Sequence, residues 1–451
     1  MSIKYDVVII GAGVAGATAA YFIAKNGFKV ALVDIKSEEN IGNKVCGDAI
    51  GEHHFVDLGL ETPVIGEDAT NIYDGVKVVS PDEQYVIDVL GRGYSLNRER
   101  FGYKLYRNAV SAGAEPYLQH YYVKPLIEGS WIKGVEIKDV NGYAKLLNSN
   151  IVIDASGVAS VVRTSLPSEW WVTDRIPKND FCVTYREIVE GDIQGVDEKY
   201  AYIYLSTEIA PGGYWWLFPK GEGVYNIGLG LQWKDNVHPK KNYDRYIRTK
   251  LGNSINRIIH AGGGLVPTRR PLSCMVWNGF IVIGDAAATA NPIHGGGIGS
   301  SMISAKIAAN VISDALHNGF VGMENLWKYH IQYHKAYGAK QASLDILRMF
   351  IQRLSNNDFN FVFRSRLVNG DDVYGMGSHG ELSSSIFDRL KSLLTLASRP
   401  SFLAKLYKVK QYMDRAYMLY LSFPQSHTEF LKWRNEERNL FSEFAGWLQS
   451  W

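Results

Sequence analysis

The sequence predicts an α/β protein in which a Rossmann-like three-layer domain is interrupted by an antiparallel β-sheet and followed by a helical C-terminal region. Three observations support this prediction. The first 34 residues contain a strand, a glycine-rich turn, a helix and a second strand. Residues from about 181 to 233 are strand-like and aromatic, and from about residue 300 the apolar spacing is helical to the C-terminus.

Length and composition limit what this fold can be. With 451 residues, 46% hydrophobic and 21% charged, the chain resembles globular proteins of two or three domains. A net charge of +2 creates no global field that attracts nucleic acid. Three cysteines do not form a disulfide framework, and no apolar run approaches the about 20 residues that span a bilayer. We therefore expect a cytoplasmic protein, with peripheral contact at the inner face of the membrane.

The opening strand–helix–strand unit is the clearest element. Residues 5–10 form a continuous apolar, β-branched run, which is typical of a parallel strand buried on both faces. Residues 17–26 follow as a helix of small residues that ends at Gly27. Residues 28–33 predict a second buried strand, and Asp34 comes directly after it.

The glycines of this unit predict a dinucleotide site. Gly11 permits the tight turn, Gly13 lets a pyrophosphate approach the backbone, and Gly16 lets the helix lie against the strand. Free N–H groups at the helix N-terminus face the phosphates, and Asp34 is placed to accept hydrogen bonds from ribose hydroxyls. At this point NAD and FAD are both open, and a glycine-rich helix cap without a ligand is the alternative.

Two later turns favour FAD. Residues 152–157 end a strand in small residues, and residues 281–283 form a buried strand that runs into Asp285 and then into the triplet 295–297, which is all glycine. A second carboxylate can bind the ribityl chain that FAD has and NAD lacks, and the glycines let backbone N–H groups face the flavin edge. The sequence therefore predicts non-covalent FAD on a domain of the glutathione-reductase type, the alternative being turns without a ligand.

Strands and helices alternate along the rest of the chain. Residues 98–112 have helical periodicity, and residues 132–137 and 144–153 flank an Asn-Gly pair that is typical of a hairpin turn. We divide the chain into a FAD-binding domain of residues 1–58, 93–170 and 276–330, a substrate sheet of residues 59–92 and 171–275, and a C-terminal helical region of residues 331–451.

Several motifs together resemble those of a known family. Arg98 and Phe101 match an Arg-x-x-Phe that opens a helix, and residues 44–48 match a cysteine-containing flavin loop. A P-x-x-Y-x-W-x-F-P motif with a later G-x-G is matched by Pro211, Tyr214, Trp216, Phe218, Pro219, Gly228 and Gly230. In these motifs, over about residues 4–330 and into the helical tail, the chain resembles the geranylgeranyl reductase family, within the para-hydroxybenzoate hydroxylase superfamily of FAD proteins.

The resemblance implies an oxidoreductase that saturates isolated C=C bonds in geranylgeranyl chains of membrane-lipid precursors, using hydride from reduced FAD and a proton. The implied substrate is a geranylgeranylated glycerophospholipid or a related polyprenyl compound. The electron donor, NAD(P)H or a ferredoxin-like protein, stays open. An aromatic hydroxylase of the same fold and a flavin-bound lipid carrier without turnover are the alternatives. We expect no metal site and no nucleic-acid partner.

From the turns and the resemblance we predict three groups of site residues. The catalytic candidates are Cys46, His294 and Tyr214, and the substrate contacts are Tyr214, Trp216 and Phe218. The cofactor contacts are Gly11, Gly13, Ala15, Gly16, Asp34, Val45, Cys46, Asp48, Arg98, Val123, Asp285, Gly296, Gly297 and Ile298.

Two of these groups have plain structural alternatives. Tyr214, Trp216 and Phe218 alternate along a predicted strand and therefore share one face, where they form either a wall for an isoprenoid chain or ordinary sheet core. Cys46 is either a thiol that supplies a proton or positions substrate, or a small buried apolar residue. Cys182 and Cys274 have no comparable motif, and we interpret them as structural.

One basic segment is ambiguous. Residues 389–410 contain six Lys and Arg residues, no acid and several interleaved leucines. Such a segment either lies on an anionic lipid surface or forms a solvated helical face over the cavity.

Overall fold

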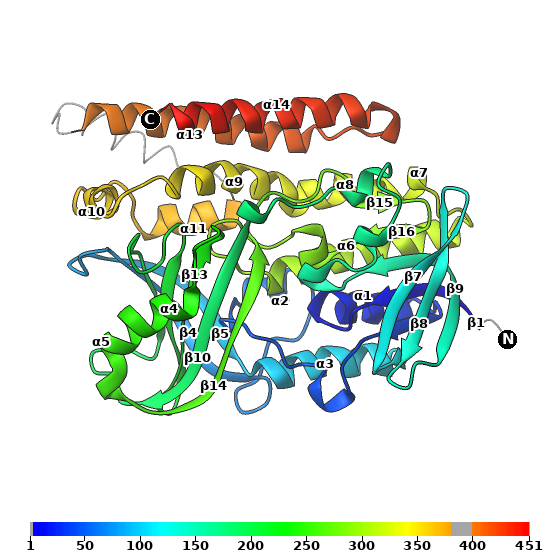
Figure 1. The fold of residues 1–451 in the computed structure, drawn as a ribbon, viewed down its shortest axis with the longest axis horizontal. Coiled ribbons are helices and arrows are strands. Elements are labelled where there is room, and N and C mark those ends of the chain that lie inside the picture. Colours follow the sequence, from blue (N-terminus) through cyan, green and yellow to red (C-terminus); the bar gives the residue numbers. More distant parts are fainter. Residues whose placement is uncertain (1–2, 380–398, 451) are drawn as a thin grey trace.

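The computed structural model describes residues 3–379 and 399–450, which form two sheets and a helical layer (Figure 1). The first sheet has the order β15-β16-β9-β1-β2-β6; β8 also pairs with β9, and β7 pairs with β8. Its strands β16, β9, β1, β2 and β6 run parallel. Its strands are β1 (Ile3–Ile10), β2 (Val30–Val33), β6 (Glu115–Tyr117), β7 (His120–Glu128), β8 (Trp131–Asp139), β9 (Ala144–Asp154), β15 (Val276–Trp277) and β16 (Phe280–Val282).

Helices pack against this sheet and, with it, form the domain that is predicted to bind FAD. The helix α1 (Val14–Lys25) lies between α3 (Arg98–Ser111) and α6 (Ile298–His317) (Figure 1). The small side chains of α1, which are mostly Ala and Gly, let it approach the sheet closely, and its residues from Val14 to Ala20 are all buried. The hairpin predicted around Asn141-Gly142 joins β8 to β9 and is confirmed.

The second sheet is mostly antiparallel and has the order β14-β10-β13-β12-β11-β4-β5-β3. Only its β4–β11 pair is parallel. Its strands are β3 (Ala49–Gly51), β4 (Ala69–Val79), β5 (Val86–Leu96), β10 (Phe181–Gly191), β11 (Tyr200–Tyr204), β12 (Tyr214–Gly221), β13 (Val224–Gln232) and β14 (Ile255–Pro267). The predicted fold class, a Rossmann-like domain with an inserted antiparallel sheet, is confirmed; the domain boundaries themselves stay predictions.

The remaining helices form the C-terminal layer and three short connections. In Figure 1, α13 and α14 pair along one edge of the molecule, next to α9 and away from the sheets. The elements are α2 (His53–Val56), α4 (Pro239–Asn242), α5 (Thr249–Leu251), α7 (Met323–Leu326), α8 (Lys328–Tyr333), α9 (Ala339–Ile351), α10 (Asn356–Arg364), α11 (Gly370–His379), α13 (Pro400–Leu421) and α14 (Phe430–Gln449).

Buried ion pairs fasten this layer to the rest of the chain. Arg270, which follows β14, donates to Glu437 of α14 over 2.7 Å and to Asp345 of α9 over 3.1 Å. Arg348 of α9 also contacts Asp345, at 2.7 Å. Because both carboxylates are fully buried, loss of Arg270 would leave Glu437 without a cationic partner, so this pair fixes where α14 sits.

Among the described residues, none of the helices combines the length and apolarity that crossing a bilayer requires. Part of the basic segment, residues 389–398, lies outside the described residues. Within its described part, Arg399 pairs with Asp358 at 2.6 Å and Lys410 pairs with Asp414 at 2.5 Å.

Candidate active site

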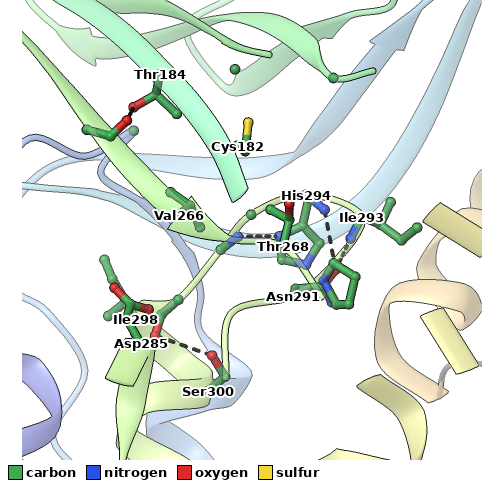
Figure 2. Close-up of a pocket in the computed structure, with 18 of the residues that line it drawn as sticks. Cys182, Thr184, Val266, Thr268, Asp285, Asn291, Ile293, His294, Ile298 and Ser300 are labelled. Atoms are coloured by element: carbon green, nitrogen blue, oxygen red, sulfur yellow. Dashed lines mark hydrogen bonds between the residues drawn. The ribbon is translucent and has the colours of Figure 1, made fainter. Parts of the chain in front are cut away.

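A cavity of about 2200 Å³ is lined by both sheets and by residues of α6, α9, α11 and α14. Figure 2 shows one part of it, where Asp285 and Ile298 face Cys182, Thr184 and Val266 of the second sheet across the hollow. The cavity therefore brings together segments that the sequence places far apart.

At the glycine turn after β1, two of the three glycines leave no room for a side chain. Gly11 has φ +103°, and a Cβ on it would lie 2.4 Å from the carbonyl oxygen of Ala155. A Cβ on Gly16 would lie 1.8 Å from the carbonyl oxygen of Gly11. A Cβ on Gly13 would meet no atom within 4 Å, so the approach to the N-terminus of α1 is open to a phosphate group.

Asp34 and Arg98 border the same turn. Asp34 accepts hydrogen bonds from the backbone N–H of Ala12 at 2.7 Å and of Lys36 at 2.9 Å, which fixes its carboxylate at the end of β2. Arg98 is 9% exposed and donates to the carbonyl oxygen of Gly42 over 3.4 Å. Its Nε has no partner among the described residues. This unpartnered buried donor, together with the open glycine turn, fits the diphosphate of FAD.

The second predicted turn lies next to the N-terminal part of α1, where a Cβ on Gly284 would lie 2.8 Å from the Cβ of Ala15. The carboxylate of Asp285 pairs with Lys44 at 3.2 Å, and a Cβ on Gly297 would lie 3.1 Å from its Oδ1. Gly296, Gly297 and Ile298 line the cavity where α6 begins. These residues fit the ribityl and flavin portions of FAD, because a carboxylate, a glycine loop and a helix N-terminus meet there.

The other predicted cofactor contacts divide into two cases. Ala15, Val45, Cys46 and Asp48 line the cavity, whereas Gly16 does not and is buried in α1. Val123 lies on β7, is 38% exposed and is not among the residues that line the cavity, although its neighbour Tyr122 is. Its role stays a prediction.

His294 and Tyr214 touch each other. The Tyr214 hydroxyl donates to the carbonyl oxygen of His294 over 2.6 Å, and the His294 Nδ1 accepts from the N–H of Gly296 over 3.1 Å. Burial lowers the pKa of His294 to about 4, so its ring is neutral at pH 7 with the proton on Nε2. Burial also raises the pKa of Tyr214, so its hydroxyl stays protonated.

Cys46 lies in the loop that faces these residues. Its Sγ accepts from the N–H of Asp48 over 3.3 Å. Burial, and secondarily the charge of Asp48, raises the pKa of the Cys46 thiol, so the sulfur keeps its proton at neutral pH. A Cβ on Gly47 would lie 3.3 Å from the ring of Phe218, so this loop packs directly against β12.

The three rings of β12 share one face, as predicted. Ring centroids are 6.0 Å apart for Tyr214 and Trp216 and again for Trp216 and Phe218, and all three rings line the cavity. Trp215 and Leu217, the residues between them, pack in a separate apolar core on the opposite face of the sheet. The alternating rings therefore form a wall of the cavity, although Trp216 and Phe218 are themselves largely buried.

Sequence reasoning missed the polar network behind this wall. The buried amide of Asn226 accepts from Trp216 Nε1 over 3.0 Å and donates to the Cys46 carbonyl over 2.9 Å and to Asp48 over 3.1 Å. Lys220 also donates to Asp48, over 3.1 Å. A polar residue inside the apolar strand 224–232 was the available signal. The network ties the cysteine loop to the aromatic strand.

The two other cysteines differ in position. Cys274 is buried in the core and its Sγ donates to the carbonyl oxygen of Val276 over 3.3 Å. Cys182 instead lines the cavity, and a Cβ on Gly230 would lie 2.9 Å from its Sγ. Burial raises the pKa of both thiols to about 12, which makes them poor nucleophiles.

Comparison with known proteins places the chain. A model of the geranylgeranyl reductase catalytic domain matches residues 180–266, and a model of FAD-dependent oxidoreductases matches residues 6–167. A digeranylgeranylglycerophospholipid reductase of Sulfolobus acidocaldarius is 39% identical over 447 residues, covering 98% of each chain. The chain belongs to the geranylgeranyl reductase family. It is a FAD-dependent oxidoreductase.

Two further comparisons agree with this family assignment. An enzyme of Methanothrix thermoacetophila with the same name as the Sulfolobus protein is 31% identical and covers 84% of this chain and 95% of its own. Among solved structures, a geranylgeranyl bacteriochlorophyll reductase-like protein from Thermoplasma acidophilum has a TM-score of 0.77 at 25% identity, and covers 91% of this chain and 100% of that one. A flavin-dependent brominase, at 19% identity and a TM-score of 0.63, shares the fold.

Proposed function

We propose that this enzyme saturates isolated C=C bonds in the geranylgeranyl chains of a glycerophospholipid. The observation that carries the proposal is that one cavity holds the dinucleotide turn, the Cys46 thiol and the wall of three rings. The names of the family's digeranylgeranylglycerophospholipid reductases support the substrate class. An isoprenoid offers no hydrogen-bonding groups, so an apolar wall that gains about 0.8 kcal/mol per buried CH₂ suits it.

Bound FAD, when reduced, supplies a hydride to one carbon of the double bond. The protein must supply a proton to the other carbon, and the contacts favour Cys46 Sγ as its source. Its raised pKa keeps the thiol protonated. The lowered pKa leaves His294 without an imidazolium proton, and the Tyr214 proton is held by a backbone carbonyl.

The rings of β12 have a second role in this proposal. Protonation of an unactivated alkene places positive charge on the more substituted carbon, because no carbonyl is present to polarise. The faces of Tyr214, Trp216 and Phe218 stabilise such charge through their quadrupoles. The nearby network of Asn226 holds Trp216 in place.

The physiological setting belongs to the proposal as well. Because the substrate is a membrane lipid, we place the enzyme in the cytoplasm with peripheral contact at the inner face of the membrane. The electrons come from NAD(P)H or a ferredoxin-like protein.

Anaerobic reoxidation tests the proposed function. Holoenzyme bleached with dithionite is mixed with a geranylgeranylated glycerophospholipid, and the flavin absorbance is expected to return. The fully saturated lipid is the control and should leave the flavin bleached. A hydroxylated product formed from an aromatic substrate, NAD(P)H and oxygen would favour the hydroxylase, and a lipid that binds without anaerobic recovery of the flavin absorbance would favour a carrier.

A further inference from the structure

The cations that line the cavity are not equivalent. Most have an acceptor or ring partner, as do Lys36, Lys44, Arg92, Arg98, Arg186, Arg270, Lys340 and Arg348. Three others, Lys234, Arg353 and Arg438, also line the cavity. For these three side chains, the described residues supply no hydrogen-bond or ion-pair partner.

All three cations line the part of the cavity formed by β13, α9 and α14, which we call its mouth. Gln352 donates to Gln232 over 2.6 Å, which joins the end of α9 to the end of β13. Arg353 and Lys234 follow these two glutamines in the chain. Arg438 follows Glu437, whose carboxylate holds Arg270 at 2.7 Å, and Arg270 in turn contacts α9. The mouth therefore lies where β13, α9 and α14 meet.

The acids around this mouth do not neutralise it. Three buried or partly buried carboxylates nearby already have arginine partners. Asp180 pairs with Arg269 and Arg348. Asp345 pairs with Arg270 and Arg348, and Glu437 pairs with Arg270. Three acids thus balance three arginines. Asp235 and Glu436 are close in sequence to the mouth residues but do not line the cavity. Lys234, Arg353 and Arg438 are all solvent-exposed, so the mouth presents three uncompensated positive charges.

The wall just inside the mouth is apolar. The lining residues of α9, α10 and α14 and of the segment between α9 and α10 include Leu347, Ile351, Leu354, Phe359, Phe441, Ala445 and Leu448. A basic rim above an apolar wall matches a ligand that has an anionic head and a hydrocarbon tail. Guanidinium groups bind phosphate oxygens in a bidentate way, and lysine acts as a point charge.

We propose that Lys234, Arg353 and Arg438 bind the phosphate of the substrate's headgroup, with the prenyl chains running past α14 into the cavity. This inference rests on the proposed function and names the part of the lipid that each region of the cavity takes. It predicts recognition of a phosphate ester at the mouth, separate from the chemistry at Cys46.

The test compares two lipids and two double variants of the holoenzyme. R353Q/R438Q removes two mouth charges, and R175Q/K432Q removes two exposed charges that do not line the cavity. The substrates are digeranylgeranylglycerophosphate and digeranylgeranylglycerol, which carry the same chains with and without phosphate. We expect KM for the phospholipid to rise about tenfold in R353Q/R438Q, with kcat unchanged, and to stay at the parent value in R175Q/K432Q. K234Q should give a smaller rise.

A binding measurement keeps the test independent of turnover. The dissociation constant of saturated diphytanylglycerophosphate, measured by calorimetry in detergent, should rise about tenfold in R353Q/R438Q. Inorganic phosphate should compete only far above the dissociation constant of the lipid, because the free anion gains nothing from the apolar wall. Phosphate that binds as tightly as the lipid would identify the free anion as what the mouth selects and would overturn the headgroup assignment. Equal losses for both lipids, or no loss for either, would also overturn it. A parent enzyme that binds diphytanylglycerophosphate through these arginines but reduces neither lipid would contradict the proposed function alone.

Discussion

Glycines allow close packing both at the turn after β1 and beside the aromatic strand β12, but against different neighbours. In the turn after β1, the Cβ of an added side chain on Gly11 or Gly16 would strike backbone carbonyl oxygens. Beside the aromatic wall, a Cβ on Gly47 or Gly230 would meet only side-chain atoms, of Phe218, Trp216, Cys182 and Thr184. Backbone atoms held by a sheet cannot move aside, whereas rings and thiols can change rotamer. Gly11 and Gly16 therefore admit no side chain, whereas Gly47 and Gly230 lie against groups that can shift; other glycines of the second sheet, such as Gly213, also face backbone oxygens.

Substitution of Gly16 tests the turn after β1 and should have the largest effect. In Gly16→Ala the new methyl would overlap the Gly11 carbonyl, at 1.8 Å, so α1 must leave the sheet. We expect protein without bound FAD, measured by the flavin absorbance of the purified enzyme. Gly230→Ala, the matched change beside the aromatic strand, should keep FAD. Gly446→Ala, on an open face of α14, should stabilise the fold by about 0.5–1 kcal/mol. Normal FAD content in Gly16→Ala would break the comparison.

Cys46→Ala tests whether the Cys46 thiol supplies the proton. If the thiol supplies the proton, anaerobic reoxidation by the prenyl lipid should slow by about 10²–10⁴-fold, with FAD content and dithionite reduction unchanged. Cys46→Ser should fall between the parent and Cys46→Ala, because a hydroxyl is a weaker acid. Reoxidation at the parent rate in stopped flow would leave Cys46 as a packing residue.

Asn226→Leu tests whether the aromatic strand β12 depends on its polar network. The change leaves Trp216 Nε1 without its acceptor and removes one donor to Asp48. We expect a loss of about 1–3 kcal/mol in the free energy of unfolding and a lower kcat/KM, with FAD retained. Asn435→Leu, an exposed position on α14, is the control. Parent-like kinetics in Asn226→Leu would show that the hydrogen bonds of this network do not contribute to kcat/KM.

The smallest expected effect concerns the C-terminal helical layer. His334 is buried among Tyr420, Phe423 and Trp433, and burial lowers its pKa to about 3. The unfolded chain binds a proton near pH 6.5 that the folded chain rejects, so stability falls as pH drops from about 6.5 toward 3. We compare the free energy of unfolding of His334→Phe with that of the parent. Lowering the pH from 8 to 5 should shift this difference by about 1–2 kcal/mol in favour of His334→Phe. Denaturant titration at the two pH values measures this, and equal differences would contradict the burial argument.

The same contrast explains how far the sequence could predict the molecule. The turns at Gly11–Gly16 and at Asp285 are local, because every residue of each motif lies within a few positions along the chain, and the structure has them where the pattern indicates. The network around Asn226 joins residues about 180 positions apart, and no spacing rule links them. Strand β14 was not predicted either, because its run of four small residues, Ala261–Gly264, hides the alternation typical of a strand.

The lining of the cavity was predicted for one strand and missed for most of the helices. The alternation of Tyr214, Trp216 and Phe218 fixed their common face. The cations of the mouth come from the ends of β13 and α9 and from α14, and their meeting depends on buried pairs such as Arg270–Glu437. Such pairs are set by tertiary packing and leave no periodic signal in the sequence.

Mass spectrometry of the lipid tests most directly whether this cavity performs the proposed reduction. Holoenzyme is mixed with dithionite and digeranylgeranylglycerophosphate in D₂O without oxygen, and the molecular mass of the extracted lipid is measured. Dithionite supplies only electrons, and the N5 hydrogen of reduced flavin exchanges with solvent, so both hydrogens added to a double bond come from the solvent. In D₂O the product should therefore gain two deuterium atoms, or four mass units, for each double bond reduced. The undeuterated control should gain two mass units per double bond. A lipid of unchanged mass beside fully reduced, bound FAD would contradict the assignment.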